Sequence, residues 1–313
     1  MKKLISICLV LLMSVAILSS CNQLVEEEKI ATEDALEFHL LEDGTYGVSA
    51  GDANNFDKVV IPSTHNDKPV TKVMDKAFFE ADNIKTIIVP DSVTSIGEYA
   101  FSECSSLKNL TIGNGVTYVG QAAFNNSHKL EYNRYDNGYY LGNNTNPYVI
   151  LVFGQITHPD KIISSCEIHS QTKIIHFAAF YNNDDLKSIT IPNGVIFIGN
   201  GAFGHCDSLE SVTIPGSVKG MDAGVFSKCS GLKYVTVDEG VTTLGEYMFD
   251  DCTSLEIVSL PKSLKTIEDA VFADCTSLES INFGGTKEQW NDINKSSIWD
   301  VKAGNYTVHC SGR

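Results

Sequence analysis

The chain has 313 residues, of which 43% are hydrophobic and 20% are charged, a balance that excludes a disordered chain and fits a folded one. The net charge of −16 disfavours nucleic acid as a partner, because backbone phosphates need a basic protein face. The nine cysteines are many for a reduced cytosolic enzyme but far fewer than a disulfide-stapled scaffold carries.

The first twenty residues have the parts of a secretory signal. Two lysines at positions 2 and 3 precede an apolar stretch from Leu4 to Leu18, and two serines follow it. The apolar stretch is shorter than the roughly 20 residues that a membrane-spanning helix needs. We therefore expect residues 1–20 to be removed as a signal peptide.

A cysteine follows this signal. Leu18-Ser19-Ser20-Cys21 resembles the lipobox of bacterial lipoproteins, and the resemblance implies that the Cys21 thiol receives diacylglycerol and becomes the new N-terminus. An ordinary secretory signal and an uncleaved anchor are the alternatives. Residues 21–35 contain three consecutive glutamates, whose mutual repulsion predicts a solvated, lipidated tether. A helix start at Thr32 to Leu36 is the alternative.

Residues 36–313 are expected to form a single domain. At its start, Leu36–Leu40 and Thr45–Val48 flank an Asp43-Gly44 turn, which predicts a β-hairpin. We expect this hairpin, within residues 36–62, to cap the N-terminal end of the domain.

A 23-residue repeat fills most of this domain. Its clearest mark is a phenylalanine after a small or apolar residue, and the spacing is 23 residues except for one step of 56. Aliphatic residues recur five before and six after it, and apolar residues at nine and eleven after it alternate as in a half-buried strand. The repeat phenylalanines are Phe78, Phe101, Phe124, Phe180, Phe203, Phe226, Phe249 and Phe272.

Each 23-residue unit is interpreted as one coil of a solenoid. One coil cannot bury its apolar columns alone, whereas stacked coils share a continuous core. The strands of successive coils are expected to pair in parallel, about 4.8 Å apart, in a curved sheet. The fold class is therefore a β-rich leucine-rich repeat solenoid.

The step of 56 residues predicts an insertion. Ile163, Cys166 and Ile168 fit a coil that kept its strand but lost its Ala-Phe half. In place of that half, residues 132–155 are rich in tyrosine, and they are predicted to form a β-hairpin that protrudes from the solenoid.

The C-terminal residues 284–313 are expected to close the other end of the core. Within them, Lys287–Ile293 carries Trp290 and Ile293 three residues apart, which predicts a short amphipathic helix over the last coil.

The outward positions of the predicted strands carry mainly small hydroxyl side chains. The candidate binding face consists of Thr86, Thr111, Thr190, Thr213, Tyr234 and Thr236, together with Tyr139 and Tyr140 of the insertion. Concave solenoid faces are frequent binding surfaces. The alternative is that the threonines serve only strand propensity, and that the insertion only covers the incomplete coil.

These columns resemble the BspA-like leucine-rich repeat family of bacterial surface proteins. The family pattern is nearly complete in Ile96–Val116 and Ile198–Val218, and Gly285–Trp290 and Tyr306–Cys310 are similar to its C-terminal ending. The resemblance covers about residues 36–313. It implies secreted or surface proteins that engage host matrix, other cells or polymers, and it implies no catalytic residues.

No pattern in the sequence indicates an enzyme, a cofactor or a metal site. Five cysteines stand three residues after a repeat phenylalanine, and we interpret them as a buried ladder of small apolar side chains. The alternative is a metal or redox site, but metal ligands must converge on one point, whereas a ladder is linear. Gly199–Gly204 matches a dinucleotide-binding pattern but lacks the βαβ unit that such a site requires. The five cysteines are Cys104, Cys206, Cys229, Cys252 and Cys275.

The sequence thus predicts a lipid-anchored, monomeric, extracellular protein for binding or adhesion. Its partner would be an extracellular protein or glycan, and its membrane contact the lipid on Cys21. The alternative is a non-catalytic component that captures or presents glycans in nutrient uptake.

Overall fold

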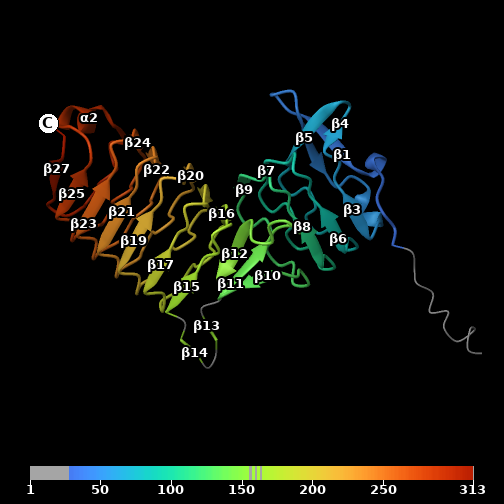
Figure 1. Ribbon diagram of the computed structural model, residues 1–313, viewed down its shortest axis with the longest axis horizontal. Coiled ribbons are helices and arrows are strands. Elements are labelled where there is room, and N and C mark those ends of the chain that lie inside the picture. Colours follow the sequence, from blue (N-terminus) through green and yellow to red (C-terminus); the bar gives the residue numbers. More distant parts are fainter. Residues whose placement is uncertain (1–27, 155–156, 159–160, 163, 313) are drawn as a thin grey trace, which may run out of the picture.

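The computed structural model describes residues 28–154, 157–158, 161–162 and 164–312. The chain winds into a solenoid in which most coils contribute two strands, one to each of two walls (Figure 1). The long-strand wall holds the 3-stranded sheet β3-β6-β8 and the 7-stranded sheet β15-β17-β19-β21-β23-β25-β27. The short-strand wall is built mainly from two-residue strands. The predicted leucine-rich repeat solenoid is confirmed.

The strands of the long-strand wall carry the alternating columns predicted from the sequence. Their bounds are β3 Lys58–Val60, β6 Thr86–Ile88, β8 Asn109–Thr111, β15 Ser165–Glu167, β17 Ser188–Thr190, β19 Ser211–Ile214, β21 Tyr234–Val237, β23 Ile257–Leu260, β25 Ser280–Phe283 and β27 Thr307–Cys310. Neighbours pair in parallel, at a step of 23 residues within the regular array, as Val212, Val235 and Val258 show. The step is 28 between β3 and β6 and 27 between β25 and β27. These three valines point inward and are buried, whereas the residues directly before and after each of them in its strand face outward.

The short-strand wall follows the aliphatic column before each phenylalanine. Its strands are β5 Lys68–Val73, β7 Ser95–Ile96, β9 Tyr118–Val119, β16 Ile174–Ile175, β18 Phe197–Ile198, β20 Gly220–Met221, β22 Thr243–Leu244, β24 Thr266–Ile267 and β26 Asn294–Lys295. These strands pair in parallel within their sheets. Between the walls, the repeat phenylalanines stack face to face, with ring centroids 5.0 to 6.1 Å apart. The stack is interrupted once, between Phe124 and Phe180.

The N-terminal cap is the predicted hairpin. β1 Glu37–Leu40 pairs antiparallel with β2 Tyr46–Ser49, and Gly44 in the turn has φ +82°, which glycine adopts without strain. β2 then joins β5 in parallel, and β4 Thr64–His65 pairs with β5. Short 3₁₀ turns at Glu33–Ala35 and Ala53–Asn55 complete the cap. The prediction that residues 21–35 form a solvated tether is therefore wrong for residues 28–35, because Ala31 and Ala35 are buried in the core and the N–H of Ala31 donates to the carbonyl of Lys58.

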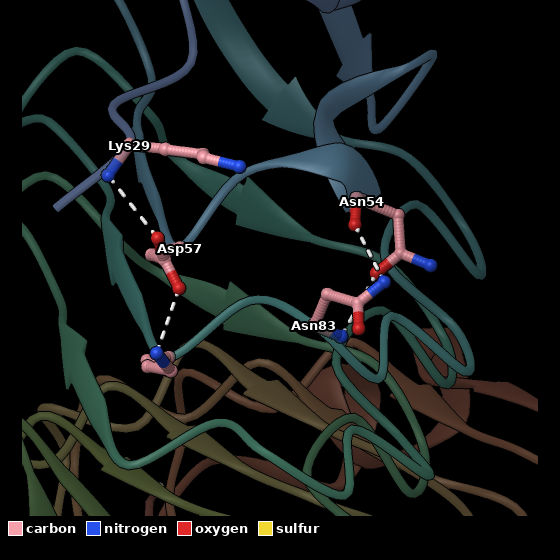
Figure 2. A network of polar contacts seen from close by, with 5 residues as sticks. Lys29, Asn54, Asp57 and Asn83 are labelled. Carbon is pink, nitrogen blue, oxygen red and sulfur yellow. Dashed lines mark hydrogen bonds and ion pairs between the residues drawn. The ribbon is translucent and has the colours of Figure 1, made fainter. Parts of the chain in front are cut away.

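Polar contacts fasten the edge of the first coil. Figure 2 shows Asp57 accepting from the backbone N–H of Lys29, and Asn54 bonded twice to Asn83. Asp57 also forms a 2.7 Å ion pair with Lys85, and the hydrogen bond from Lys85 holds the pKa of Asp57 below its ordinary value. These contacts bind the N–H groups of Lys29 and Asn83 and the carbonyl of Asn54 within the protein.

The insertion contains the predicted hairpin, but the hairpin does not protrude. β11 Gly138–Leu141 pairs antiparallel with β12 Ile150–Gly154, and β10 Asn133–Tyr135 adds a third strand. β12 then pairs in parallel with β16, so the insertion forms part of the short-strand wall. The incomplete coil kept its strand as predicted, because Cys166 and Ile168 are buried and β15 pairs with β17; Ile163 lies outside the described residues. β13 Thr157–His158 pairs with β14 Lys161–Ile162.

The C-terminal cap contains the predicted helix. α2 Lys287–Asp292 begins with a capping box, in which the hydroxyl of Thr286 accepts from the N–H of Gln289 and the side chain of Gln289 accepts from the N–H of Thr286. Ile293 is buried behind the helix, and Trp290 packs against the last coils. The Trp299 ring ends the stack of phenylalanines at 5.8 Å from Phe272.

Candidate functional site

Four adjacent strands present a regular outward surface, which we call the strand face. It consists of the outward residues of β17, β19, β21 and β23, namely Ser188, Thr190, Ser211, Thr213, Tyr234, Thr236, Ile257 and Ser259. Among the predicted binding residues, Thr190, Thr213, Tyr234 and Thr236 lie here and are exposed. The pairing of Ser211 with Tyr234, and of Tyr234 with Ile257, places Tyr234 in the middle of the surface.

Tyr234 is the large aromatic side chain of the strand face. Its side chain is 46% exposed, and its hydroxyl donates to Oε2 of Glu256 at 3.2 Å. That hydrogen bond raises the pKa of Tyr234, and the charges of Glu256, Glu210 and Glu279 act in the same direction. The site therefore combines an accessible ring with an acidic surround, which suits a partner rich in hydrogen-bond donors or positive charge.

The other two threonines lie on the separate sheet β3-β6-β8. Thr86 and Thr111 are half-buried rather than exposed. Thr111 forms an isolated bridge with Gly142 of the insertion, and it lines a groove of about 510 Å³ between β8 and the insertion. Asn109, Asn133 and Asn143 also line this groove. The predicted binding residues are therefore not brought together on one sheet.

The prediction that Tyr140 lies on an exposed face is wrong. Tyr140 has 0% exposure, its hydroxyl accepts from the N–H of His169 at 3.3 Å, and its ring meets Tyr148 edge to face at 5.4 Å. β12 carries an extra residue, Val152, opposite the step from Tyr139 to Tyr140, and past this irregularity Tyr140 and Leu141 are both buried. Burial raises the pKa of Tyr140. Tyr140 therefore packs the insertion against the core.

Tyr139 belongs to an aromatic cluster on the outer side of the insertion. Its ring stacks on Phe153 at 4.5 Å, and the guanidinium of Arg134 lies 4.5 Å from the ring centroid. Tyr132 meets Phe153 edge to face at 5.1 Å. Phe153 is 37% exposed. Phe153, Tyr132 and Arg134 were not among the predicted binding residues, although the tyrosine-rich composition of the insertion pointed to this region.

The cysteine ladder is part of the core. The five thiols are fully buried, and each donates to the carbonyl oxygen of the repeat phenylalanine in the preceding coil, at 3.0 to 3.3 Å. Burial raises the pKa of Cys104 to about 11 and that of Cys275 to about 12, so these thiols stay protonated. Among the described residues, no group of three His, Cys, Asp or Glu side chains is placed to hold a metal ion.

His176 is a buried histidine that directly follows β16, next to the interruption of the phenylalanine stack. It stands where other coils have glycine, and its Nε2–H donates to the carbonyl of Gly120 at 3.3 Å. Its ring lies 5.0 Å from the ring of Phe124. Burial lowers the pKa of His176 to about 4, so the imidazole is neutral at pH 7.

The predicted signal peptide and the lipid-attachment residue Cys21 lie outside the described residues. A helix long and apolar enough to cross a membrane was not found in the part of the chain that the structure describes.

Comparison with known proteins gives one extensive sequence match. The model of the BspA type leucine rich repeat region matches residues 52–145 and 162–298, in 6 copies. The two matched ranges hold most of the coils described above. No curated protein matches the chain.

Solved structures match over most of their length at low identity. A leucine-rich repeat protein from Eubacterium ventriosum is 19% identical, with 86% of this chain and 93% of that chain covered and a TM-score of 0.45. The pneumococcal vaccine antigen PcpA is 18% identical, with 82% and 78% covered and a TM-score of 0.47. The T. pallidum leucine-rich repeat protein is 22% identical, with 80% and 91% covered and a TM-score of 0.33.

Proposed function

Because the chain belongs to the BspA-type leucine-rich repeat family of bacterial surface proteins, we propose that it is a non-enzymatic recognition protein that binds an extracellular protein through its strand face. The observation that carries the proposal is the exposed Tyr234, set among small hydroxyl side chains and next to the carboxylate of Glu256. Tyrosine is enriched among the residues that dominate the energy of protein interfaces.

The packing of the strand face supports this role. Its side chains stand on a parallel ladder whose inner valines are buried, so the surface is held rigid before a partner arrives. A rigid surface loses little conformational entropy on binding. The carboxylates of Glu210, Glu256 and Glu279 add an acidic field that attracts lysine and arginine side chains of a partner.

Replacing Tyr234 with alanine is expected to weaken binding by about tenfold or more, because the ring supplies the largest contact area on the strand face. The melting temperature should stay within about 2 °C, because the side chain is half exposed. Retention of the protein on immobilised matrix proteins, together with a melting curve, measures both effects.

Tyr247 offers a matched control for this substitution. Its side chain is 47% exposed but lies on a turn next to Phe249, and its φ of +55° is shared by Ala178 and Ala270 at the same repeat position. Tyr247→Ala should therefore fold and bind like the wild type. If Tyr247→Ala and Tyr234→Ala weaken binding equally, the strand face is not the binding surface.

Capture of glycans is a second candidate function. The groove beside Thr111 is lined by the amides of Asn109, Asn133, Asn143 and Asn144 and by the ring of Tyr132, groups that suit sugar hydroxyls and a sugar face. Saturable binding of soluble oligosaccharides on a glycan array, weakened by Asn109→Ala but not by Tyr234→Ala, would favour this function. The opposite pattern would favour protein recognition.

We further propose that the protein is held on the outer side of the membrane by a lipid on Cys21. The lipobox-like sequence supports a diacylglyceryl group, and two acyl chains anchor a protein stably whereas one chain anchors it only marginally.

Cys21→Ala is expected to move the protein from the membrane fraction to the medium or to block its maturation. Immunoblots of the two fractions, with Cys310→Ala as a control that keeps the lipobox, measure the distribution. A mature Cys21→Ala protein that stays in the membrane would show that the lipid is not the anchor.

A further inference from the structure

The turns that carry the repeat phenylalanines form a second hydrogen-bonded ladder. In six coils, the phenylalanine and the residues two before and two after it each donate their N–H group to a carbonyl of the next coil. Phe101 shows the pattern, since Tyr99, Phe101 and Glu103 donate to Gln121, Ala123 and Asn125. Of the corresponding donors in the last phenylalanine-bearing coil, at Ala270, Phe272 and Asp274, two bond to the C-terminal cap.

One coil lacks all three of these bonds. The N–H groups of Ala122, Phe124 and Asn126 have no hydrogen-bond partner among the described residues, because the next coil lost its Ala-Phe half. The turn is otherwise held firmly, since the carbonyl of Asn125 accepts from the N–H of Glu103 and from the hydroxyl of Ser102. The solenoid therefore contains an open rung with three prearranged donors.

An open cavity of about 490 Å³ is lined by two of the donor residues, Phe124 and Asn126, and Ala122 lies two residues before the first of them. Phe124, Asn125 and Asn126 form one wall, and Phe177 and Ala178 belong to the opposite wall. Tyr132 and Phe153 of the aromatic cluster also line it. Among the described residues that line the cavity there is no aspartate, glutamate, lysine or arginine; the titratable side chains are His128, His176 and Tyr132, and the rest are amides, one hydroxyl and apolar or aromatic groups.

His176 closes the core side of the cavity. In the regular array, the ring of the next phenylalanine stacks on its neighbour, as Phe101 stacks on Phe124 at 6.1 Å. On the other side of Phe124, His176 takes that place and is tied to Gly120. The cavity therefore admits a main chain with small side chains but has no place for a buried phenylalanine.

We propose that this open rung binds an extended segment of a partner polypeptide, whose main-chain carbonyls accept from the N–H groups of Ala122, Phe124 and Asn126. The spacing of the donors supports this, because in six other coils the three corresponding N–H groups, two residues apart, donate to main-chain carbonyls. Adding a backbone to an unpaired ladder is an established mode of peptide recognition. This site is separate from the strand face and does not depend on it.

Amide hydrogen exchange of the purified protein, measured by NMR, tests the proposal. The probe is a capped heptapeptide that copies residues 199–205 with alanine at position 203. In the protein, the carbonyls of Asn200, Ala202 and Gly204 accept from the three donors of the Phe180 coil, so this backbone has the required pattern. Alone, the Phe124 N–H should exchange about a hundredfold faster than that of Phe101. Millimolar probe should slow exchange at Ala122, Phe124 and Asn126 by about tenfold, and leave Phe101 unchanged.

Two matched variants complete the test. Asn125→Trp places a bulky side chain at the exposed rim of the cavity and should abolish the slowing. Ser227→Trp makes the same change at the same repeat position of a coil whose rung is closed, and it should leave the slowing intact. A Phe124 N–H that is protected without the probe would overturn the proposal. So would a probe that slows nothing, slowing that survives Asn125→Trp, or protection by a neutral malto-oligosaccharide but not by the peptide.

Discussion

Replacing Phe226 with alanine is expected to lower the free energy of unfolding by about 3–5 kcal/mol, the usual effect of removing a buried aromatic ring. Phe226 is fully buried, and its ring lies between those of Phe203 and Phe249 at 5.0 and 5.7 Å. The backbone of each neighbouring coil is bonded to this coil, so the cavity cannot collapse easily. Urea denaturation of the wild type and the variant measures the difference.

Cys229→Ala is the control for this substitution. Cys229 stands three residues after Phe226, and its thiol makes one hydrogen bond, to the carbonyl of Phe203. Removing a sulfur atom and a weak hydrogen bond should lower the free energy of unfolding by about 1 kcal/mol. A Cys229→Ala variant that is as unstable as Phe226→Ala would show that the ladder is a bonded or metal-binding site instead of apolar packing.

Acidification from pH 7 to pH 4 is expected to remove about 3 kcal/mol of stability through His176 alone. The folded protein holds the pKa of His176 at about 4, whereas the unfolded chain has the ordinary value of 6.5. Between pH 6.5 and pH 4, His176 is protonated in the unfolded chain but neutral in the folded protein. The contribution is therefore complete above pH 6.5 and is lost as the pH falls toward 4.

The pH dependence of His176 is isolated by comparison with His176→Gln. Glutamine can donate to the carbonyl of Gly120 but does not titrate, so the stability difference between the two proteins should change by about 3 kcal/mol over this range. The comparison is needed because hydrogen bonds also lower the pKa values of Asp57 and Asp82, so protonation of these carboxylates in acid likewise lowers the stability of the protein. Parallel curves from pH 7 to pH 4 would show that His176 is solvated.

Most of the fold could be predicted because the same repeat determines the strand pairing, the orientation of the side chains and the core. The 23-residue step sets the parallel register, the period-2 alternation sets which side of each strand is buried, and the phenylalanine column sets the stacked core. Both caps were also predictable, because the Asp43-Gly44 turn and the apolar spacing of Trp290 and Ile293 are local signals.

The insertion was predictable in kind but not in detail. The run Tyr139-Tyr140-Leu141 holds two tyrosines in succession, so the sequence does not tell which of them faces the core. The irregular pairing of β11 with β12 decides it. Pairing across a bulge is a tertiary property that local periodicity does not report. The open rung was hidden for a similar reason. The step of 56 residues shows that half a coil is missing, but only the stacking of the coils shows which N–H groups lose their partners.

Recognition through the strand face is tested by binding to a panel of immobilised matrix proteins after charge is introduced on this face. Thr213→Lys/Thr236→Lys places two lysines on exposed positions of this face, and Ser230→Lys/Ser277→Lys makes the same charge change on exposed turns. We expect the first variant to lose at least about tenfold in affinity for whichever matrix protein the wild type binds. The second variant should bind normally, and both should melt like the wild type. Full binding by the folded Thr213→Lys/Thr236→Lys variant would contradict recognition through the strand face.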